Sequence, residues 1–242
     1  MRPAGKEMKE MMPVFGHHAS AAGAMPGETS APGVLLEARD VRKAYGRHEV
    51  LRGADLAAGP GQLIGVVGEN GAGKSTLLKI LAGTLAADRG SVQLAGTLGY
   101  CPQDPVLNDN LTVDQHLRYF AAACRLPALD RAEELAGQLG YAQHRREAAG
   151  TLSGGTRQKL NLTLALMHDP DVLLLDEPYQ GFDWETYLRF WDLVTDLRAR
   201  RKAIVIITHL VFEQDRFDLL ADLSGGRLTR RPAQGKDNHA SH

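Results

Sequence analysis

Short apolar runs alternate with segments of helical periodicity along most of the chain. Three of these runs, at residues 63–67, 172–175 and 203–207, are nearly continuous and have the length of buried parallel strands. Residues 34–37 also look like a strand, and residues 91–94 alternate like a half-buried one. Strands that alternate with helices predict an α/β fold with a largely parallel sheet that is covered on both faces.

The helices between these strands are predicted from apolar residues at helical spacing. One helix should follow the run 63–67, with an apolar face formed by Leu77, Leu78, Leu81 and Leu85. Another should begin near Asp183, with one apolar face formed by Trp184, Tyr187, Leu188, Trp191 and Val194.

Residues 111–150 have a helical character throughout, which predicts a small all-helical insertion. Thr112 with Gln115, and Asp130 with Glu133, have the spacing of two capping boxes at helix starts. Gly140 has the position of a residue that ends a helix.

Composition limits the classes of protein that remain. The 242 residues suit one large domain, or one domain with an inserted subdomain. The 28 basic and 29 acidic residues give a net charge of −1, without the basic excess of nucleic-acid-binding surfaces. Two cysteines, Cys101 and Cys124, exclude a disulfide scaffold and fit a reducing compartment. No apolar run is long enough to span a membrane, and the N-terminus lacks the apolar core of a signal peptide.

Residues 68–75 match the pattern G-x-x-x-x-G-K-[ST] in the context that the pattern requires, between a buried strand and an amphipathic helix. The glycines allow backbone N–H groups to converge on phosphate oxygens, at the positive end of the helix. Lys74 is expected to reach the outer phosphates, and the Ser75 hydroxyl to ligate Mg²⁺. The candidate nucleotide-binding residues of this segment are Gly68, Asn70, Gly71, Gly73, Lys74, Ser75 and Thr76.

The apolar run 172–175 ends in two carboxylates, Asp176 and Glu177. The carboxyl end of a parallel strand lies at the sheet edge where α/β proteins hold their sites. Asp176 is therefore a candidate Mg²⁺ ligand, directly or through water. Glu177 is the candidate that orients and polarises the attacking water.

A third motif narrows the possible families of nucleotide-binding protein. Residues 152–155 read LSGG and open a helix shortly before the strand 172–175. The same letters recur at 223–226 without such a strand after them, and this second copy is interpreted as a turn. With the LSGG at 152–155 in this order, the sequence resembles the ATP-binding cassette (ABC) family over roughly residues 34–230.

The resemblance implies roles for further residues. Tyr45 matches the aromatic residue that stacks on adenine, and Gln103 the residue that contacts metal and water. His209 matches the histidine near the γ-phosphate, and Asp183 lies in the loop that couples the two sites of a dimer. Ser153 and Gly155 match residues that hold the ATP bound to a second copy. The resemblance thus implies catalytic roles for Glu177, His209, Gln103 and Lys74, and metal contacts for Ser75, Gln103 and Asp176.

The implied fold is that of a P-loop NTPase, with a mostly parallel sheet and flanking helices, an N-terminal antiparallel β part and a small helical insertion. The implied ATPase domain covers 34–231, with a helical subdomain at about 104–168. Residues 1–33 are expected to form a disordered tail and 232–242 a flexible one.

The implied activity is ATP hydrolysis with Mg²⁺, in an ATP-sandwiched dimer that drives a separate transmembrane permease subunit from the cytoplasmic face of the membrane. Export is favoured over import because a long C-terminal regulatory domain is missing.

The alternative is a soluble ABC ATPase that acts on the ribosome or another assembly. Such proteins usually carry two cassettes or long coiled coils, and the neutral charge argues against direct nucleic-acid contact. A P-loop kinase or GTPase is disfavoured by the LSGG and by the lack of an N-K-x-D motif.

The chain departs from the family pattern at several places. Thr156 replaces the usual glutamine after the LSGG, and the stretch 90–103 is short. Tyr179 and Gln180 stand where small residues are common, and Trp184 where proline is common. These changes make the loop around Asp183 unusually bulky and aromatic.

Overall fold

The computed structural model describes residues 33–208 and 215–232. The two tails, with the exception of Gly33 and Pro232, and the candidate catalytic residue His209 lie outside the described residues. Within the described part, no helix is long and apolar enough to cross a membrane.

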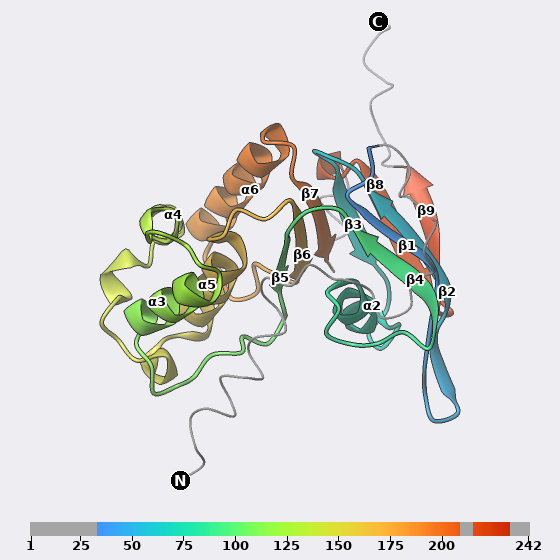
Figure 1. The fold of residues 1–242 in the computed structure, drawn as a ribbon, viewed down its shortest axis with the longest axis horizontal. Helices are drawn as coiled ribbons and strands as arrows, with labels where there is room; N and C mark the ends of the chain where they lie inside the picture. The colour runs from blue at the N-terminus through green and yellow to red at the C-terminus, as the bar shows by residue number, and fades with distance from the viewer. Residues whose placement is uncertain (1–32, 209–214, 233–242) are drawn as a thin grey trace, which may run out of the picture.

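A six-stranded sheet forms the centre of the molecule (Figure 1). Its order is β5-β6-β7-β3-β8-β9, and the first five strands run parallel while β9 pairs antiparallel with β8. The bounds are β3 (Leu63–Val67), β5 (Leu98–Cys101), β6 (Val172–Asp176), β7 (Ala203–Ile207), β8 (Leu219–Ser224) and β9 (Arg227–Pro232). The three nearly continuous apolar runs of the sequence are thus strands, as predicted, and they are the adjacent strands β6, β7 and β3.

Side chains of these central strands alternate between two separate hydrophobic cores. In β6, Leu173 and Leu175 belong to one core, while Val172 and Leu174 belong to the other. Strand β7 divides in the same way, with Ile204 among the side chains of the first core. Because both faces are covered, neither face carries polar residues, which explains why the runs are continuous rather than alternating.

One core lies between the central sheet and a second, antiparallel sheet. This three-stranded sheet has the order β2-β1-β4, with β1 (Leu36–Tyr45), β2 (His48–Ala58) and β4 (Arg89–Leu94). Helix α2 (Lys74–Leu81) lies between the two sheets in Figure 1, and its leucines pack into this core. The predicted strand at 34–37 is in fact the start of the much longer β1.

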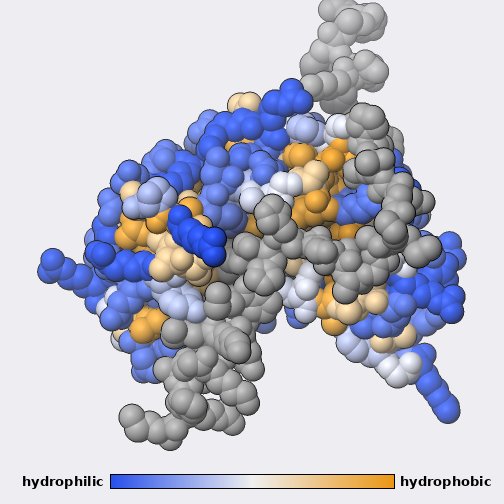
Figure 2. Space-filling model, viewed as in Figure 1, coloured by the Kyte–Doolittle hydropathy of each residue, from blue (hydrophilic) through white to orange (hydrophobic). Residues whose placement is uncertain are grey.

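The other core lies under four helices on the opposite face of the central sheet (Figure 1). They are α3 (Val113–Ala123), α4 (Asp130–Gln138), α5 (Gly154–Leu166) and α6 (Trp184–Ala199). Two short 3₁₀ turns, Ala142–His144 and Ala149–Thr151, connect α4 to α5. Figure 2 shows that hydrophilic residues predominate on the outer surface of this helical side, with hydrophobic residues in scattered groups.

Two of the predicted helix features are wrong. In α6, Trp191 and Val194 are buried as expected, but Trp184 is 72% and Leu188 41% exposed. The buried face is instead completed by Phe190, Leu193 and Leu197. The helix α4 begins at Asp130 itself, and the capping position is Leu129, without a side-chain cap, so Asp130 and Glu133 form no capping box.

The other local signals are confirmed. Thr112 and Gln115 form a full capping box at the start of α3. Gly140 has φ +70° just after α4, in the left-handed conformation that terminates a helix. Gly225 and Gly226 form the tight turn between β8 and β9, so the second LSGG is a hairpin turn.

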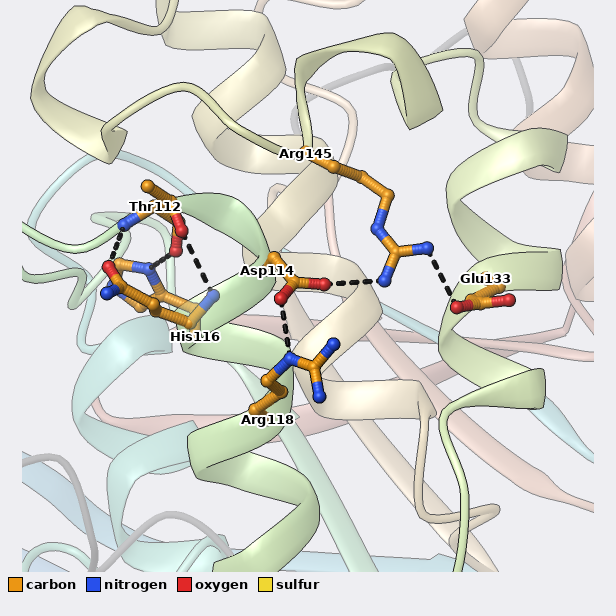
Figure 3. A network of polar contacts seen from close by, with 7 residues as sticks. Thr112, Asp114, His116, Arg118, Glu133 and Arg145 are labelled. Carbon is orange, nitrogen blue, oxygen red and sulfur yellow. Dashed lines mark hydrogen bonds and ion pairs between the residues drawn. The ribbon is translucent and has the colours of Figure 1, made fainter.

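A network of polar contacts joins α3 to the segments around it (Figure 3). Arg145 donates to Asp114 of α3 and to Glu133 of α4, and Arg118 donates to Asp114 at 2.6 Å. These guanidinium groups hold the pKa of Asp114 below its ordinary value. Next to them, His116 is fully buried; its Nε2 accepts from the Asn108 N–H at 3.1 Å and its Nδ1 lies 2.9 Å from the Thr112 carbonyl.

We expect the buried His116 to make the fold less stable in mild acid. Burial lowers the pKa of His116, and Nε2 must stay unprotonated to accept from Asn108. The hydrogen bond to the Thr112 carbonyl opposes this shift of the pKa without reversing it, and the charges of Arg157 and Asp109 have smaller effects that oppose each other. The folded chain therefore binds fewer protons than the unfolded chain, so the contribution is fully present above about pH 6.5 and is lost as the pH falls below it.

The measurement is the free energy of unfolding in urea at about pH 7.5 and about pH 5.5. We expect His116→Gln to lower stability at both pH values and to reduce the difference between them. The exposed His48→Gln should keep the wild-type difference. An unchanged pH dependence in His116→Gln would contradict this role.

Candidate nucleotide-binding and catalytic site

The loop 68–73 connects β3 to the N-terminus of α2, directly beside the antiparallel sheet. Gly73 has φ +102°, and a Cβ there would lie 2.6 Å from the Val50 Cγ1 of β2. Only glycine satisfies both the left-handed backbone and this close approach. The loop is thus fixed against β2, with the backbone N–H groups of the helix start available to an anion.

Lys74 lies inside this loop. Its Nζ donates to the carbonyl of Gly68 at 2.8 Å and to that of Glu69 at 2.9 Å, and the residue is 6% exposed. Burial lowers the pKa of Lys74, while the carboxylates of Glu177 and Asp176 act in the opposite direction. The ammonium group therefore interacts electrostatically with both acids.

Asp176, at the end of β6, is the deeply buried acid of the site. It is 2% exposed, and its Oδ1 has no hydrogen-bond partner among the described residues. Burial raises the pKa of Asp176, the Ser75 hydroxyl hydrogen-bonds to it and lowers the pKa, and the charge of Glu177 raises it. A buried carboxylate oxygen without a partner, beside a hydroxyl, is a donor set that suits Mg²⁺, because this ion prefers oxygen ligands.

Glu177 has a backbone conformation that is unusual for a non-glycine residue, with φ +49°. Its N–H donates to the carbonyl of Ile207 at 3.2 Å, and its Oε2 accepts from Gln103 Nε2 at 3.4 Å. Gln103 follows β5, which pairs parallel with β6. The carboxyl ends of these adjacent strands thus bring Gln103 to Glu177.

Tyr45 lies at the end of β1, where the chain turns into β2. Its side chain is 53% exposed, and the Lys43 ammonium lies 6.0 Å from the ring centroid. Because Val50 of β2 touches Gly73, the hairpin that carries Tyr45 borders the loop 68–73. An exposed ring at this place can offer one face to a base.

Ser153, Gly155 and Asp183 form a separate group. Ser153 is the N-cap of α5, where its Oγ accepts from the Thr156 N–H at 3.2 Å and lies 2.9 Å from the Thr156 hydroxyl. Asp183 is the N-cap of α6 and accepts from the Thr186 N–H at 2.8 Å. Among the described residues, no hydrogen bond or ion pair joins Ser153 or Gly155 to the loop 68–73.

Two contacts hold the starts of α5 and α6 together. A Cβ at Gly155 would lie 2.4 Å from the carbonyl oxygen of Gly181. The Lys159 ammonium lies 3.7 Å from Asp183 Oδ2 and 5.9 Å from the centroid of the Phe182 ring. The segment 181–183 therefore packs directly on the first turn of α5.

We expect Gly155→Ala to destabilise the fold by about 1–3 kcal/mol, because its methyl group would overlap a backbone carbonyl that cannot move alone. The neighbour Gly154 is a matched control, since a Cβ there meets nothing within 4 Å. Gly154→Ala should change stability by less than about 1 kcal/mol, because Ala suits a helix better than Gly does. Urea unfolding measures both, and equal stabilities of the two variants would contradict the close approach.

Sequence reasoning missed the buried polar side chain that links α5 to the segment before Gln103. Asn161 is 4% exposed, and its Nδ2 donates to the carbonyl of Pro102 at 2.8 Å and to Cys101 Sγ at 3.2 Å. A polar residue on the buried face of α5 was the available signal. Burial raises the pKa of Cys101, which agrees with a packed rather than a reactive thiol.

A phosphate-binding loop, a buried lysine and two acids at the carboxyl edge of a parallel sheet define a P-loop nucleoside triphosphatase. The sequence family described as ABC transporter matches residues 51–180. The chain belongs to this ABC transporter family; it binds ATP and is an ATPase.

The relatives agree with this assignment. The chain is 34% identical over 227 residues to the Nod factor export ATP-binding protein I of Ralstonia nicotianae, covering 87% of this chain and 69% of the relative. The protein of the same name from Cupriavidus metallidurans is 34% identical over 218 residues, covering 84% and 71%. The chain thus spans about two thirds of the length of these relatives.

Solved structures have the same fold. The ATP-binding subunit of an ABC transporter matches with a TM-score of 0.77 at 25% identity, over 82% of this chain and 90% of that one. A dimeric bacterial ABC transporter cassette matches with a TM-score of 0.75 at 20% identity, over 83% of this chain and all of the other, which supports the fold alone.

Proposed function

We propose that this ATPase energises export through a separate membrane-spanning permease subunit, and that it does so by closing and opening a dimer around ATP. The observation that supports the dimer is that, in the described part of the chain, no hydrogen bond or ion pair joins Ser153 or Gly155 to the loop 68–73. Lys74, Asp176 and Glu177 gather at one sheet edge, whereas Ser153 and Gly155 stand at the start of another helix. The relatives that are named export ATP-binding proteins support the direction of transport.

In this proposal the loop 68–73 and Lys74 bind the phosphates of ATP. Lys74 would exchange its two bonds to loop carbonyls for bonds to phosphate oxygens, which keeps the buried charge paired throughout. Asn70 and Thr76 flank the phosphates, and Tyr45 stacks on the adenine. Ser75, Asp176 and Gln103 would hold Mg²⁺, which neutralises phosphate charge when it is bound.

Glu177 is the proposed general base. Its carboxylate lies at the same edge as Lys74 and Asp176, with one oxygen oriented by the Gln103 amide. A carboxylate at this place can accept a proton from the attacking water as the water approaches the γ-phosphate. His209, which lies outside the described residues, is proposed to act at the same phosphate.

Ser153 and Gly155 are proposed to complete the site of a second copy. The start of α5 combines an exposed hydroxyl with the positive end of a helix, and both favour a phosphate group. Asp183, whose pKa is lowered by the backbone and hydroxyl hydrogen bonds from Thr186, would fix the adjoining loop in the same interface. ATP then acts as the contact that closes the dimer, and its hydrolysis as the release.

The permease is proposed to dock near Gln103 and the helices α3 and α4, on the cytoplasmic face of the membrane. Movement of the dimer would reach it through this region, and the permease would choose the transported compound. We propose no direct contact with nucleic acid. We propose that residues at about 104–168 form a helical subdomain, because α3, α4 and α5 fall within that range.

Purification of the tagged full chain from a gentle detergent extract of its own cells tests the partner. We expect a membrane protein with several spans to elute with it in stoichiometric amount, and the amount to fall when the extract is depleted of membranes. Elution with ribosomes or with non-membrane proteins alone would contradict the proposal and favour the non-transport alternative.

A further inference from the structure

The loop that follows Glu177 is tied to the end of β7 by two hydrogen bonds. The Glu177 N–H donates to the Ile207 carbonyl at 3.2 Å. Two residues further on, the Tyr179 hydroxyl is hydrogen-bonded to the Thr208 hydroxyl. Glu177, which makes the first of these bonds, has a backbone φ of +49°.

The ring of Tyr179 is fixed by aromatic residues of α6. Its centroid lies 5.4 Å from that of Tyr187, 5.5 Å from that of Phe190 and 6.2 Å from that of Trp191. The first two pairs are edge-to-face, an arrangement that adds stability beyond burial alone. The helix α6 therefore determines where the Tyr179 hydroxyl points.

Thr208 is fixed equally well. It is 1% exposed, and its N–H donates to the carbonyl of Val66 at 3.2 Å, in the strand that leads into the phosphate-binding loop. The hydroxyl pair thus connects three parts of the molecule: the helix α6, the loop after Glu177 and the paired ends of β7 and β3.

A non-glycine residue with positive φ persists only where its surroundings hold it in place. We propose that the Tyr179–Thr208 hydroxyl pair is such a support, and that Tyr179 is a positioning residue that sets the orientation of the Glu177 carboxylate for hydrolysis. Tyr179 acts through Glu177 and touches no reacting atom. This inference rests on the proposed role of Glu177 as the general base.

Three single substitutions separate the hydroxyl pair from packing. Tyr179→Phe keeps the ring and its aromatic neighbours, Thr208→Val keeps the shape of the side chain, and Thr208→Ser keeps the hydroxyl. We expect Tyr179→Phe and Thr208→Val each to lower kcat for ATP by about three- to tenfold, the equivalent of one net hydrogen bond. KM should stay within about twofold, and Thr208→Ser should stay close to wild type.

The double variant Tyr179→Phe with Thr208→Val provides the sharpest comparison. Because each change breaks the same bond, the double variant should be no slower than the slower single variant. A double variant whose kcat falls by the product of the two single effects would overturn the proposal. An unchanged kcat in Tyr179→Phe would also overturn it. A thermal destabilisation of Tyr179→Phe with unchanged kcat would also overturn it, because it would reveal a purely structural bond.

Wild type and Glu177→Gln are assayed in the same series. An inactive wild type, or an active Glu177→Gln, would refute the proposed function itself. An active wild type and an inactive Glu177→Gln, combined with a normal Tyr179→Phe, would refute only the positioning role.

Discussion

Glu177→Gln should reduce ATP hydrolysis by about 10²–10⁴-fold, which is the usual contribution of a general base, and should leave ATP binding in place. Glutamine keeps the size and the polar contacts of the side chain, including the partner Gln103 at 3.4 Å, but it cannot take a proton from water. Lys74 and the loop 68–73 are untouched, so the nucleotide still binds. Because hydrolysis is the proposed release step, a dimer should accumulate in the presence of ATP and Mg²⁺.

Phosphate release measures the rate, and light scattering after size-exclusion chromatography measures the dimer. Glu134→Gln, an exposed position on α4, is the matched control and should behave like wild type. Near-normal turnover in Glu177→Gln would refute this residue as the catalytic base. A variant that neither binds ATP nor dimerises would contradict the proposed order of closure and release.

Lys74→Ala should weaken ATP binding by roughly 10- to 150-fold, because a hydrogen bond from a charged group contributes about 1.5–3 kcal/mol. The lysine is the buried cation of the site, and its removal leaves phosphate charge facing Asp176 and Glu177 without compensation. The substitution also removes the bonds to the Gly68 and Glu69 carbonyls, so the empty loop should become less ordered.

The exposed lysine in the last turn of the same helix, Lys79, is the control. Lys79→Ala should retain affinity within about threefold, since a surface charge interacts weakly through water. Titration calorimetry with ATP and Mg²⁺ measures both variants. Equal affinities of Lys74→Ala and wild type would refute the loop 68–73 as the phosphate site.

Much of the fold could be predicted from the sequence because its central strands are buried on both faces. A short continuous apolar run such as 172–175, in a chain where such runs alternate with helical segments, is typical of a strand that is buried on both faces. The antiparallel sheet was less visible, since β1 and β2 are half-exposed and their pairing contains register shifts. Strand β5 has only four residues, one of them Gly99, which is too short a pattern to recognise.

The helix α6 shows that hydrophobic periodicity alone does not predict which residues of a helix are buried. Two stripes of this helix have helical spacing: one through Tyr187, Trp191 and Val194, the other through Phe190, Leu193 and Leu197. Both contribute to the core, whereas Trp184 in the first turn extends beyond it and stays exposed. The hydrophobic pattern marks the stripes, but the packing of neighbouring elements decides which residues they include.

Candidate site residues could be proposed from the sequence where a motif lies on a recognisable strand or helix, as with Lys74 and Asp176. The contacts that hold the site together were not predictable, because they join residues distant in sequence. The hydroxyls of Tyr179 and Thr208 meet across 29 positions, and Asn161 reaches Pro102 across 59. Only the folded chain brings such pairs together.

The proposed ATP site shared between two copies of the chain can be tested by mixing two inactive variants. Lys74→Ala lacks the phosphate lysine, whereas Ser153→Asp keeps an N-cap residue for α5 but places a negative charge where the partner's phosphate would lie. In a mixed dimer, the intact loop 68–73 of the Ser153→Asp chain faces the intact Ser153 of the Lys74→Ala chain. We predict that an equimolar mixture recovers up to about one quarter of the wild-type ATPase rate, because half of the dimers are mixed and each mixed dimer has one complete site out of two. A mixture as inactive as either variant alone would contradict a site shared between two copies.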